Sequence, residues 1–185
     1  DIENRGQVGA LSDLAIVTDL DGARVGVDII NSGTITGVLE LRSAGEDNTF
    51  TNSGLWAIRG FADSDGDGVR DTERVALSYF GGDNDLFTNQ ANGVISLLSS
   101  PGTDVGGAGV EEAEIRDLEL LRNAGTITMA DAETGFGSAV AGDRLLLVGN
   151  LESLDGVLRL DSRLDAGGPG NQLTDRFLVQ GDASG

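Results

Sequence analysis

The stretch "NSGTITG", residues 31–37, joins a turn to a short strand. Asn31, Ser32 and Gly33 are residue types that favour turns, because short polar side chains and glycine satisfy tight backbone geometry. Residues 34–36 then alternate polar, apolar and polar side chains, which predicts a half-buried strand. One such unit fits an ordinary hairpin, so the fold depends on whether the unit repeats.

The unit recurs four times along the chain. The copies are NSGLWA (52–57), ANGVIS (91–96), NAGTIT (123–128) and LDGVLR (154–159). In each copy a glycine precedes a strand whose second residue is large and apolar; these residues are Ile35, Trp56, Ile95, Ile127 and Leu158. The glycines are separated by 21, 39, 32 and 31 residues. Self-similarity over a few tens of residues is typical of a solenoid.

Two further elements repeat. NTFTNSG (48–54) and DLFTNQANG (85–93) share Phe-Thr-Asn, and GDRLLLVGNL (142–151) matches TDRFLVQGDA (174–183), 32 residues later. The best helix candidate, VEEAEIRDLELLRN (110–123), fits equally well as a strand that leads into the next turn. Residues 1–30 carry no clear motif, although ARVGVDIINSG (23–33) fits a first repeat.

These repeats predict an all-β fold, a parallel β-helix with inserted loops. The 21-residue spacing corresponds to about one coil, and the longer spacings add loops at 60–74, 99–115, 130–142 and 161–173, all rich in polar residues and glycine. Inward asparagines at the turns can stack and hydrogen-bond along the axis, which explains their recurrence without catalysis. The alternative is an antiparallel β-sandwich with Asn-Gly hairpins, but the turn and strand recur in one direction.

The composition limits the chemistry. The 185 residues include 12 basic and 31 acidic ones, a net charge of −19, and no His or Cys. This surface repels nucleic acid and anionic lipid and favours divalent cations. Without His or Cys there is no Ser-His-Asp triad, no cysteine nucleophile and no histidine-ligated zinc. Because the chain opens with Asp1, we expect a mature product or an excised piece.

The closing stretch GDRLLLVGNLESLDGVLRLDSRLDAGGPGNQLTDRFLVQGDASG, with EDNTFTNSG, GGDNDLFTNQANG and NAGTIT, resembles the passenger region of Gram-negative autotransporters (type Va secretion). The positions that match the pattern of the last passenger coils are Leu147, Gly149, Asn150, Gly156, Leu158, Leu160, Asp175, Phe177, Val179, Gly181 and Gly185. Phe177 departs from the leucine expected there. The resemblance covers the chain from about residue 31 and is strongest at 142–185.

The resemblance implies a right-handed, single-stranded parallel β-helix, exported through a C-terminal outer-membrane β-barrel that is absent here. It divides the chain into β-helix rungs with inserted loops (1–141) and stable C-terminal coils that act as a folding nucleus, or autochaperone (142–185). The implied location is the cell surface or the secreted fraction. The implied role is structural, within an adhesin or an aggregation or biofilm factor that meets a host-cell or matrix surface, and not enzymatic.

The sharpest chemical motif is DSDGDGVRDTE, residues 63–73. Asp63, Asp65, Asp67 and Asp71 match ligand positions of a calcium loop, and Gly68 matches its glycine. Arg74 stands where the bidentate glutamate belongs, so the neighbouring Glu73 is the candidate ligand. We expect a weak structural Ca²⁺ site at these five acidic residues, against the alternative of a solvated acidic loop. GGDND (81–85) resembles half of a calcium-binding turn but occurs once, so a plain turn is favoured.

Two alternatives to the stalk remain open. A secreted β-helix enzyme acting on polysaccharide would use paired carboxylates across a cleft. A calcium-stiffened surface repeat protein would use the acidic loop alone. Trp56, Phe50 and Phe87 are predicted core residues rather than a sugar-binding platform.

Overall fold

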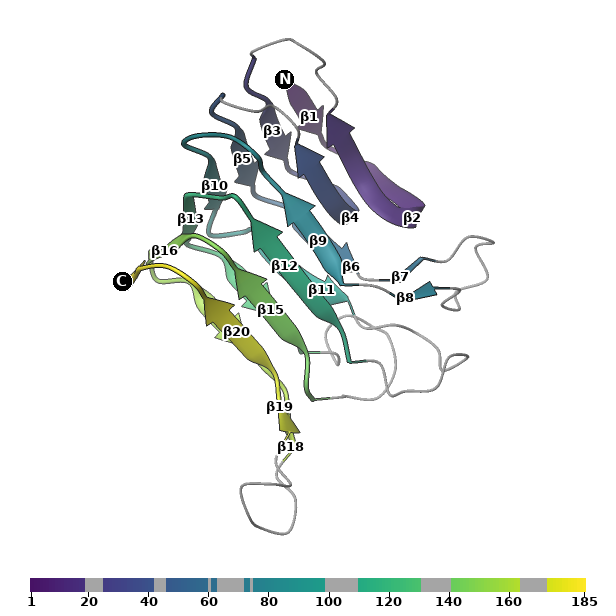
Figure 1. Ribbon diagram of the computed structural model, residues 1–185, viewed down its shortest axis with the longest axis vertical. Helices are drawn as coiled ribbons and strands as arrows, with labels where there is room; N and C mark the ends of the chain where they lie inside the picture. The colour runs from purple at the N-terminus through teal and green to yellow at the C-terminus, as the bar shows by residue number, and fades with distance from the viewer. Residues whose placement is uncertain are drawn as a thin grey trace.

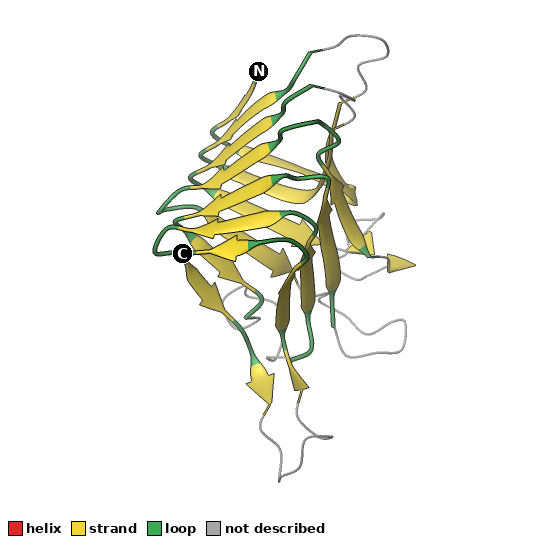
Figure 2. Ribbon diagram, turned by 60° about the vertical axis from the view of Figure 1, so that its left-hand side comes forward, coloured by secondary structure: helices red, strands yellow, loops and turns green. Residues whose placement is uncertain are grey.

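The computed structural model describes residues 1–18, 25–41, 46–59, 61–62, 72–73, 75–98, 110–130, 141–163 and 173–185. Within these ranges the chain forms strands, turns and bends and contains no helix (Figures 1 and 2). No described segment is a helix long and apolar enough to cross a membrane. The predicted all-β fold is therefore confirmed, and nearly all strand pairs are parallel.

One sheet has seven parallel strands. In spatial order they are β1 (Ile2–Asn4), β3 (Asp28–Asn31), β5 (Thr49–Asn52), β10 (Leu86–Asn89), β13 (Leu120–Asn123), β16 (Asn150–Ser153) and β21 (Ala183–Ser184). The order follows the sequence, so each return of the chain adds one strand beside the previous one. We call this the first sheet, and each of its levels a layer.

The second sheet has ten strands and two arms. The first arm contains β2 (Gln7–Thr18), β4 (Thr34–Leu41), β6 (Leu55–Arg59), β11 (Val94–Leu98), β14 (Thr126–Thr128) and β17 (Val157–Arg159). The second arm contains β9 (Ala76–Tyr79), β12 (Glu112–Arg116), β15 (Arg144–Leu147) and β20 (Arg176–Val179). The arms join where Glu40 of β4 pairs with Tyr79 of β9.

From β5 onward the chain repeats one order: first sheet, first arm, second arm. The long connections all lie between the two arms, which is where the predicted insertions fall. Two of them contain short antiparallel pairs, β7 (Phe61–Ala62) with β8 (Thr72–Glu73) and β18 (Ser162–Arg163) with β19 (Leu173–Thr174). The predicted insertion 99–115 extends too far, because residues 112–115 belong to β12. Residues 110–123 form β12 and β13, so the helix alternative is wrong there.

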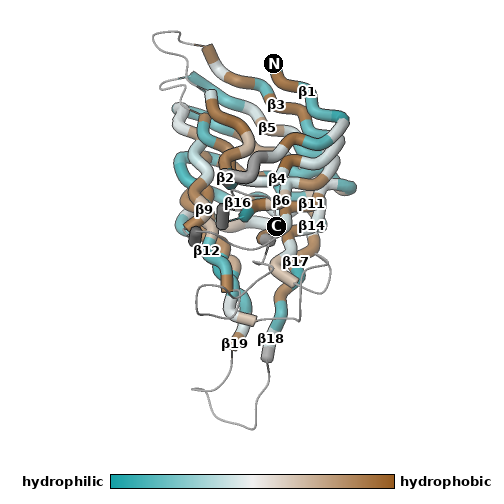
Figure 3. Tube along the Cα trace, turned by 90° about the vertical axis from the view of Figure 1, so that its right-hand side faces the viewer, coloured by the Kyte–Doolittle hydropathy of each residue, from teal (hydrophilic) through white to brown (hydrophobic). Residues whose placement is uncertain are grey.

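The repeats seen in the sequence align in register. The predicted apolar row Ile35, Trp56, Ile95, Ile127 and Leu158 consists of direct partners along the first arm. Residues 144–147 pair with residues 176–179, as the 32-residue repeat predicts. Along the strands, hydrophobic residues alternate with hydrophilic ones (Figure 3).

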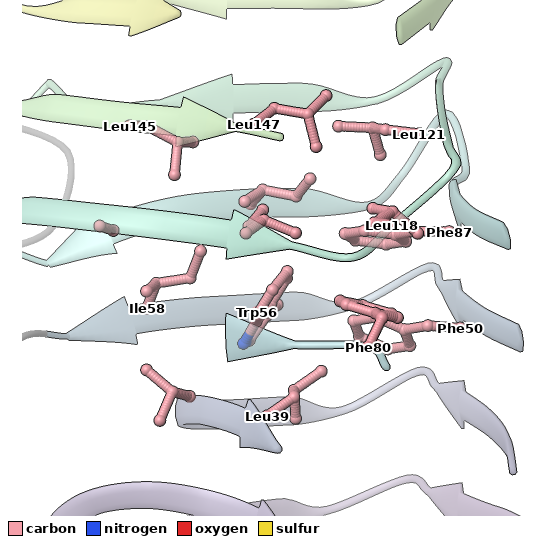
Figure 4. Close-up of a cluster of buried hydrophobic side chains, with 14 of the residues drawn as sticks. Leu39, Phe50, Trp56, Ile58, Phe80, Phe87, Leu118, Leu121, Leu145 and Leu147 are labelled. Atoms are coloured by element: carbon pink, nitrogen blue, oxygen red, sulfur yellow. The ribbon is translucent and has the colours of Figure 1, made fainter. Parts of the chain in front are cut away.

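The core lies between the sheets and is almost entirely aliphatic, with one aromatic cluster (Figure 4). Phe50 and Phe87, partners in the first sheet, stack with ring centroids 4.5 Å apart. Trp56 packs edge-on against both at 5.4 Å, and its indole N–H donates to the Gly37 carbonyl at 3.0 Å. All three rings are completely buried, which confirms that they are core residues.

Five inward asparagines form a continuous chain of side-chain hydrogen bonds, which we call the asparagine ladder: Asn4, Asn31, Asn52, Asn89 and Asn123. Each Nδ2 donates to the Oδ1 of the next layer at 2.8–2.9 Å. The predicted stacking of asparagines is thus confirmed, with two corrections. Asn89, and not Asn92 of the ANGVIS copy, is the fourth member of the ladder, and Ser153, not Asp155 of the LDGVLR copy, follows Asn123 in register.

The ladder also shows that residues 1–30 do contain a copy of the repeat, so the prediction that they carry no clear motif is wrong. The segment Asn4-Arg5-Gly6-Gln7-Val8 is a first copy of the repeat, with Asn4 in the ladder and Val8 paired with Ile35. Its polar flanks conceal it, because Arg5 stands where three later copies have Ser or Ala, and Gln7 stands where later copies have Thr, Leu or Val.

From the second layer onward, the glycine that follows the ladder asparagine lies against the backbone of the preceding layer. A Cβ built on Gly33 would lie 2.1 Å from the Gly6 carbonyl oxygen, and one built on Gly54 2.1 Å from that of Gly33. The same carbonyls accept the N–H of Thr34 and Leu55 at 2.7 and 2.9 Å. Glycine is therefore required where two layers meet at this corner.

The last layer leaves core positions open. Leu158 is 48% exposed, whereas its partner Ile127 is 2% exposed. Leu154, Val157 and Leu160 are exposed as well. The sheets continue across residue 142, and the greater stability expected of residues 142–185 stays a prediction.

The glycine corner gives a direct test. We expect Gly54→Ala to lower the free energy of unfolding by about 1–3 kcal/mol, because the new methyl group overlaps the Gly33 carbonyl and forces the layers apart. Urea denaturation followed by circular dichroism measures this loss.

Gly6→Ala is the matched control. It changes the same position of the first layer, where a Cβ meets nothing within 4 Å, so we expect a change within about 0.5 kcal/mol. Equal losses in the two variants would contradict the close contact between layers.

Candidate functional site

The predicted calcium ligands Asp63, Asp65, Asp67 and Asp71 lie outside the described residues. Glu73 is the second residue of β8, where its backbone pairs with Phe61 of β7. The flanking segments are strands, not the helices of an EF-hand. Because β7 and β8 run antiparallel, Ala62 and Thr72, the residues that flank segment 63–71, are direct partners.

The best-defined chemistry in the described chain lies at the corner that leads into the first sheet. Here Asn48, Asp85 and Glu119 precede β5, β10 and β13. Each side-chain oxygen accepts a backbone N–H of the preceding layer: Asn48 from Val27 at 2.9 Å, Asp85 from Asn48 at 2.6 Å, and Glu119 from Asp85 at 2.6 Å. This column of acceptors ties four layers together.

Asp85 is the centre of this column and belongs to the motif GGDND. Its Oδ1 also accepts from Asn48 Nδ2 at 3.1 Å, and its Oδ2 accepts the Gly82 N–H at 2.8 Å. Asp83 and Asn84, in contrast, are exposed. The motif is therefore a turn closed by its own buried aspartate, in line with the plain turn favoured from the sequence.

Burial is the largest influence on the titration of Asp85 and raises the pKa of its carboxyl above the usual 3.8. The hydrogen bonds from Asn48 and Gly82 act in the opposite direction, and the nearby Glu119 adds a smaller increase. The folded protein thus holds the proton of Asp85 more tightly than the unfolded chain does.

A second column of acids lies at the entrance to the second arm. Asp143 Oδ1 accepts the Glu111 N–H at 2.8 Å, and Asp175 Oδ1 accepts the N–H groups of Gly142 and Asp143 at 2.8 and 3.1 Å. Asp175 Oδ2 accepts the Asp161 N–H at 2.6 Å. The sequence shows the 32-residue repeat of Asp143 and Asp175 but not their role, since acidic residues are ordinarily exposed.

These two columns bind backbone groups, and that is the chemistry their geometry supports. Asp85, Glu119, Asp143 and Asp175 all accept backbone N–H groups of their own or the neighbouring layer. Among the described residues, no three His, Cys, Asp or Glu side chains are placed to hold a metal ion. Tyr79, the one phenol, donates to Asp117, whose hydrogen bond and charge raise the pKa of Tyr79.

No protein family, curated protein or solved structure matches this chain.

The raised pKa of Asp85 predicts a pH effect. Because the folded state binds this proton more tightly, Asp85 contributes most to stability at acid pH and loses that contribution as pH rises from 3.8 through its raised pKa. Asp85→Asn removes the titration. We expect the free energy of unfolding of the original protein, relative to this variant, to fall over that pH window and then level off, as measured by urea denaturation at a series of pH values.

Asp83→Asn, an exposed carboxylate on the same turn, is the control for loss of charge. A difference between original protein and Asp85→Asn that rises with pH, or that matches the Asp83→Asn difference, would show that burial does not govern Asp85.

The calcium motif is tested by metal removal. If residues 63–73 bind Ca²⁺, free calcium at about ten times Kd should add roughly 1.4 kcal/mol to the free energy of unfolding, and chelator should reverse it. Asp65→Asn/Asp67→Asn should abolish the effect, whereas the exposed pair Asp47→Asn/Asp83→Asn should retain it. A calcium effect of equal size in both variants would point to general screening of the acidic surface.

Proposed function

We propose that the chain forms a right-handed, single-stranded parallel β-helix and serves as a structural stalk. Support comes from the strand order, in which every return to the first sheet adds the next parallel neighbour. Each passage through first sheet, first arm and second arm is then one coil. The proposal adds the handedness and the single continuous helix to the observed parallel sheets.

The asparagine ladder is the observation that carries the structural role. Its four side-chain bonds run along the stacking direction across five layers, and every donor and acceptor pair is buried. Buried amide hydrogen bonds are costly to break without replacement. A stack joined in this way, with a continuous apolar core, resists bending and sliding between layers, as a spacer must.

We further propose that the stalk is part of an autotransporter passenger on the surface of a Gram-negative cell. The resemblance at 142–185 supports this, together with a charge of −19 that suits an exposed, soluble surface. Its partner would be its own C-terminal outer-membrane β-barrel, and the whole protein would act in adhesion or aggregation. The proposal assigns the segment itself no catalysis.

Protease treatment of intact source cells tests the location. An antibody against this chain should detect a protein that external protease removes, while a periplasmic protein stays intact. A signal that survives until the cells are lysed would exclude the surface location.

The coding sequence that follows Gly185 tests the family. We expect a linker and then amphipathic strands of about ten residues, as outer-membrane barrels have. A surface-exposed protein whose gene encodes no such strands would be a surface repeat protein instead of an autotransporter.

A further inference from the structure

One turn departs from the common pattern of the repeat. A single residue separates the ladder asparagine from the corner glycine at Asn31-Ser-Gly, Asn52-Ser-Gly and Asn123-Ala-Gly. Between Asn89 and Gly93 there are three residues, Gln90, Ala91 and Asn92, and all three are exposed. Asn92 and Gly93 form the one Asn-Gly pair in the sequence.

We propose that Asn92 is a site of spontaneous covalent modification, namely deamidation through a cyclic imide. The backbone nitrogen of Gly93 attacks Asn92 Cγ, a new N–Cγ bond forms, and the Cγ–Nδ2 bond breaks as ammonia leaves with the displaced proton. Water then opens the ring at either carbonyl, which yields aspartate or isoaspartate. The two steps together consume one water molecule and release one ammonia molecule, and neither step is an oxidation or a reduction.

The position of Asn92 favours this reaction. Its side chain is exposed and makes no hydrogen bond to any described residue, and glycine offers no side chain to obstruct the attack. The Gly93 N–H donates to the Gln90 carbonyl at 2.7 Å, and this bond must open first. Residues 90–92 of this turn are exposed, whereas Gly93 is buried against the Asn52 carbonyl, so the bond opens through a local fluctuation of the turn at the edge of the stack.

The ladder asparagines are protected by the same geometry that makes them structural. Asn31, Asn52 and Asn89 are completely buried, and each side chain both accepts and donates within the ladder. Their Cγ atoms can reach the attacking nitrogen only if these bonds break. Modification should therefore select Asn92 among chemically similar residues.

Isoaspartate at this position would disturb the stack next to it. It lengthens the main chain between residues 92 and 93, where the Gly93 carbonyl accepts the Thr126 N–H at 2.9 Å and Asn89 Nδ2 at 3.3 Å. Both product acids also add one negative charge to an already acidic chain. The turn thus links a slow chemical change to the contact between two layers.

The test is prolonged incubation of the folded protein at mildly alkaline pH, followed by cleavage at arginine and fragment mass spectrometry. We expect aspartate and isoaspartate to accumulate at residue 92, at a rate within about tenfold of that in the urea-unfolded chain. Asn31 and Asn52 should remain amides in the folded protein and convert only in urea. Asn92→Gln should remove the modification without changing the circular dichroism spectrum.

Two results would overturn the proposal. Residue 92 could stay an amide in the folded protein while it converts in urea, which would mean that the Gly93–Gln90 bond locks the turn. Alternatively, Asn31 and Asn52 could convert in the folded protein as fast as residue 92, which would mean that exposure does not direct the reaction.

Discussion

The stacked corner between the first sheet and the first arm determines the arrangement of the rest of the structure. At this corner an asparagine amide and a glycine carbonyl of one layer each bond to the next layer, within a few residues of one another. Because side chains alternate along a strand, fixing this point sets which residues face inward on both sides of it. Phe50 and Phe87 then meet in the first sheet, and Trp56 and Ile95 meet in the first arm.

The other two corners use acids for the same purpose. Burying a carboxylate is expensive unless hydrogen bonds compensate for lost hydration. Asp85, Asp143 and Asp175 each accept backbone N–H groups at 3.1 Å or less, so they satisfy donors that no regular strand pairing satisfies. Part of the acidic composition is thus structural and does not contribute to the surface, although the raised pKa of Asp85 shows that compensation there is incomplete.

Much of the fold could be predicted because residues that pair between layers occupy equivalent positions of a repeat that is visible in the sequence. The row from Ile35 to Leu158 and the pairing of 144–147 with 176–179 follow from spacing alone. The errors arise where the spacing changes: Gln90 to Asn92 lengthen one turn and hide the role of Asn89. The buried acids could not be predicted, because their partners are N–H groups of a different layer, which no local pattern identifies. The candidate calcium site at 63–73 comes from the sequence alone, because its acidic residues lie within eleven consecutive positions.

The column of Asp143 and Asp175 at the entrance to the second arm explains why long connections are tolerated between the arms. A chain that leaves the first arm is no longer paired with the preceding layer, and it must regain the correct register before the second arm begins. Asp175 restores this register: one oxygen accepts the N–H of Asp143 in the preceding layer, and the other accepts the N–H of Asp161 at the start of the connection. The carboxylate therefore fixes both ends of segment 161–175 whatever its length. Since closing a longer loop costs little additional entropy, sequence variation can collect in these connections while the stack stays unchanged. Segment 63–71, with its four aspartates, lies in one of these connections.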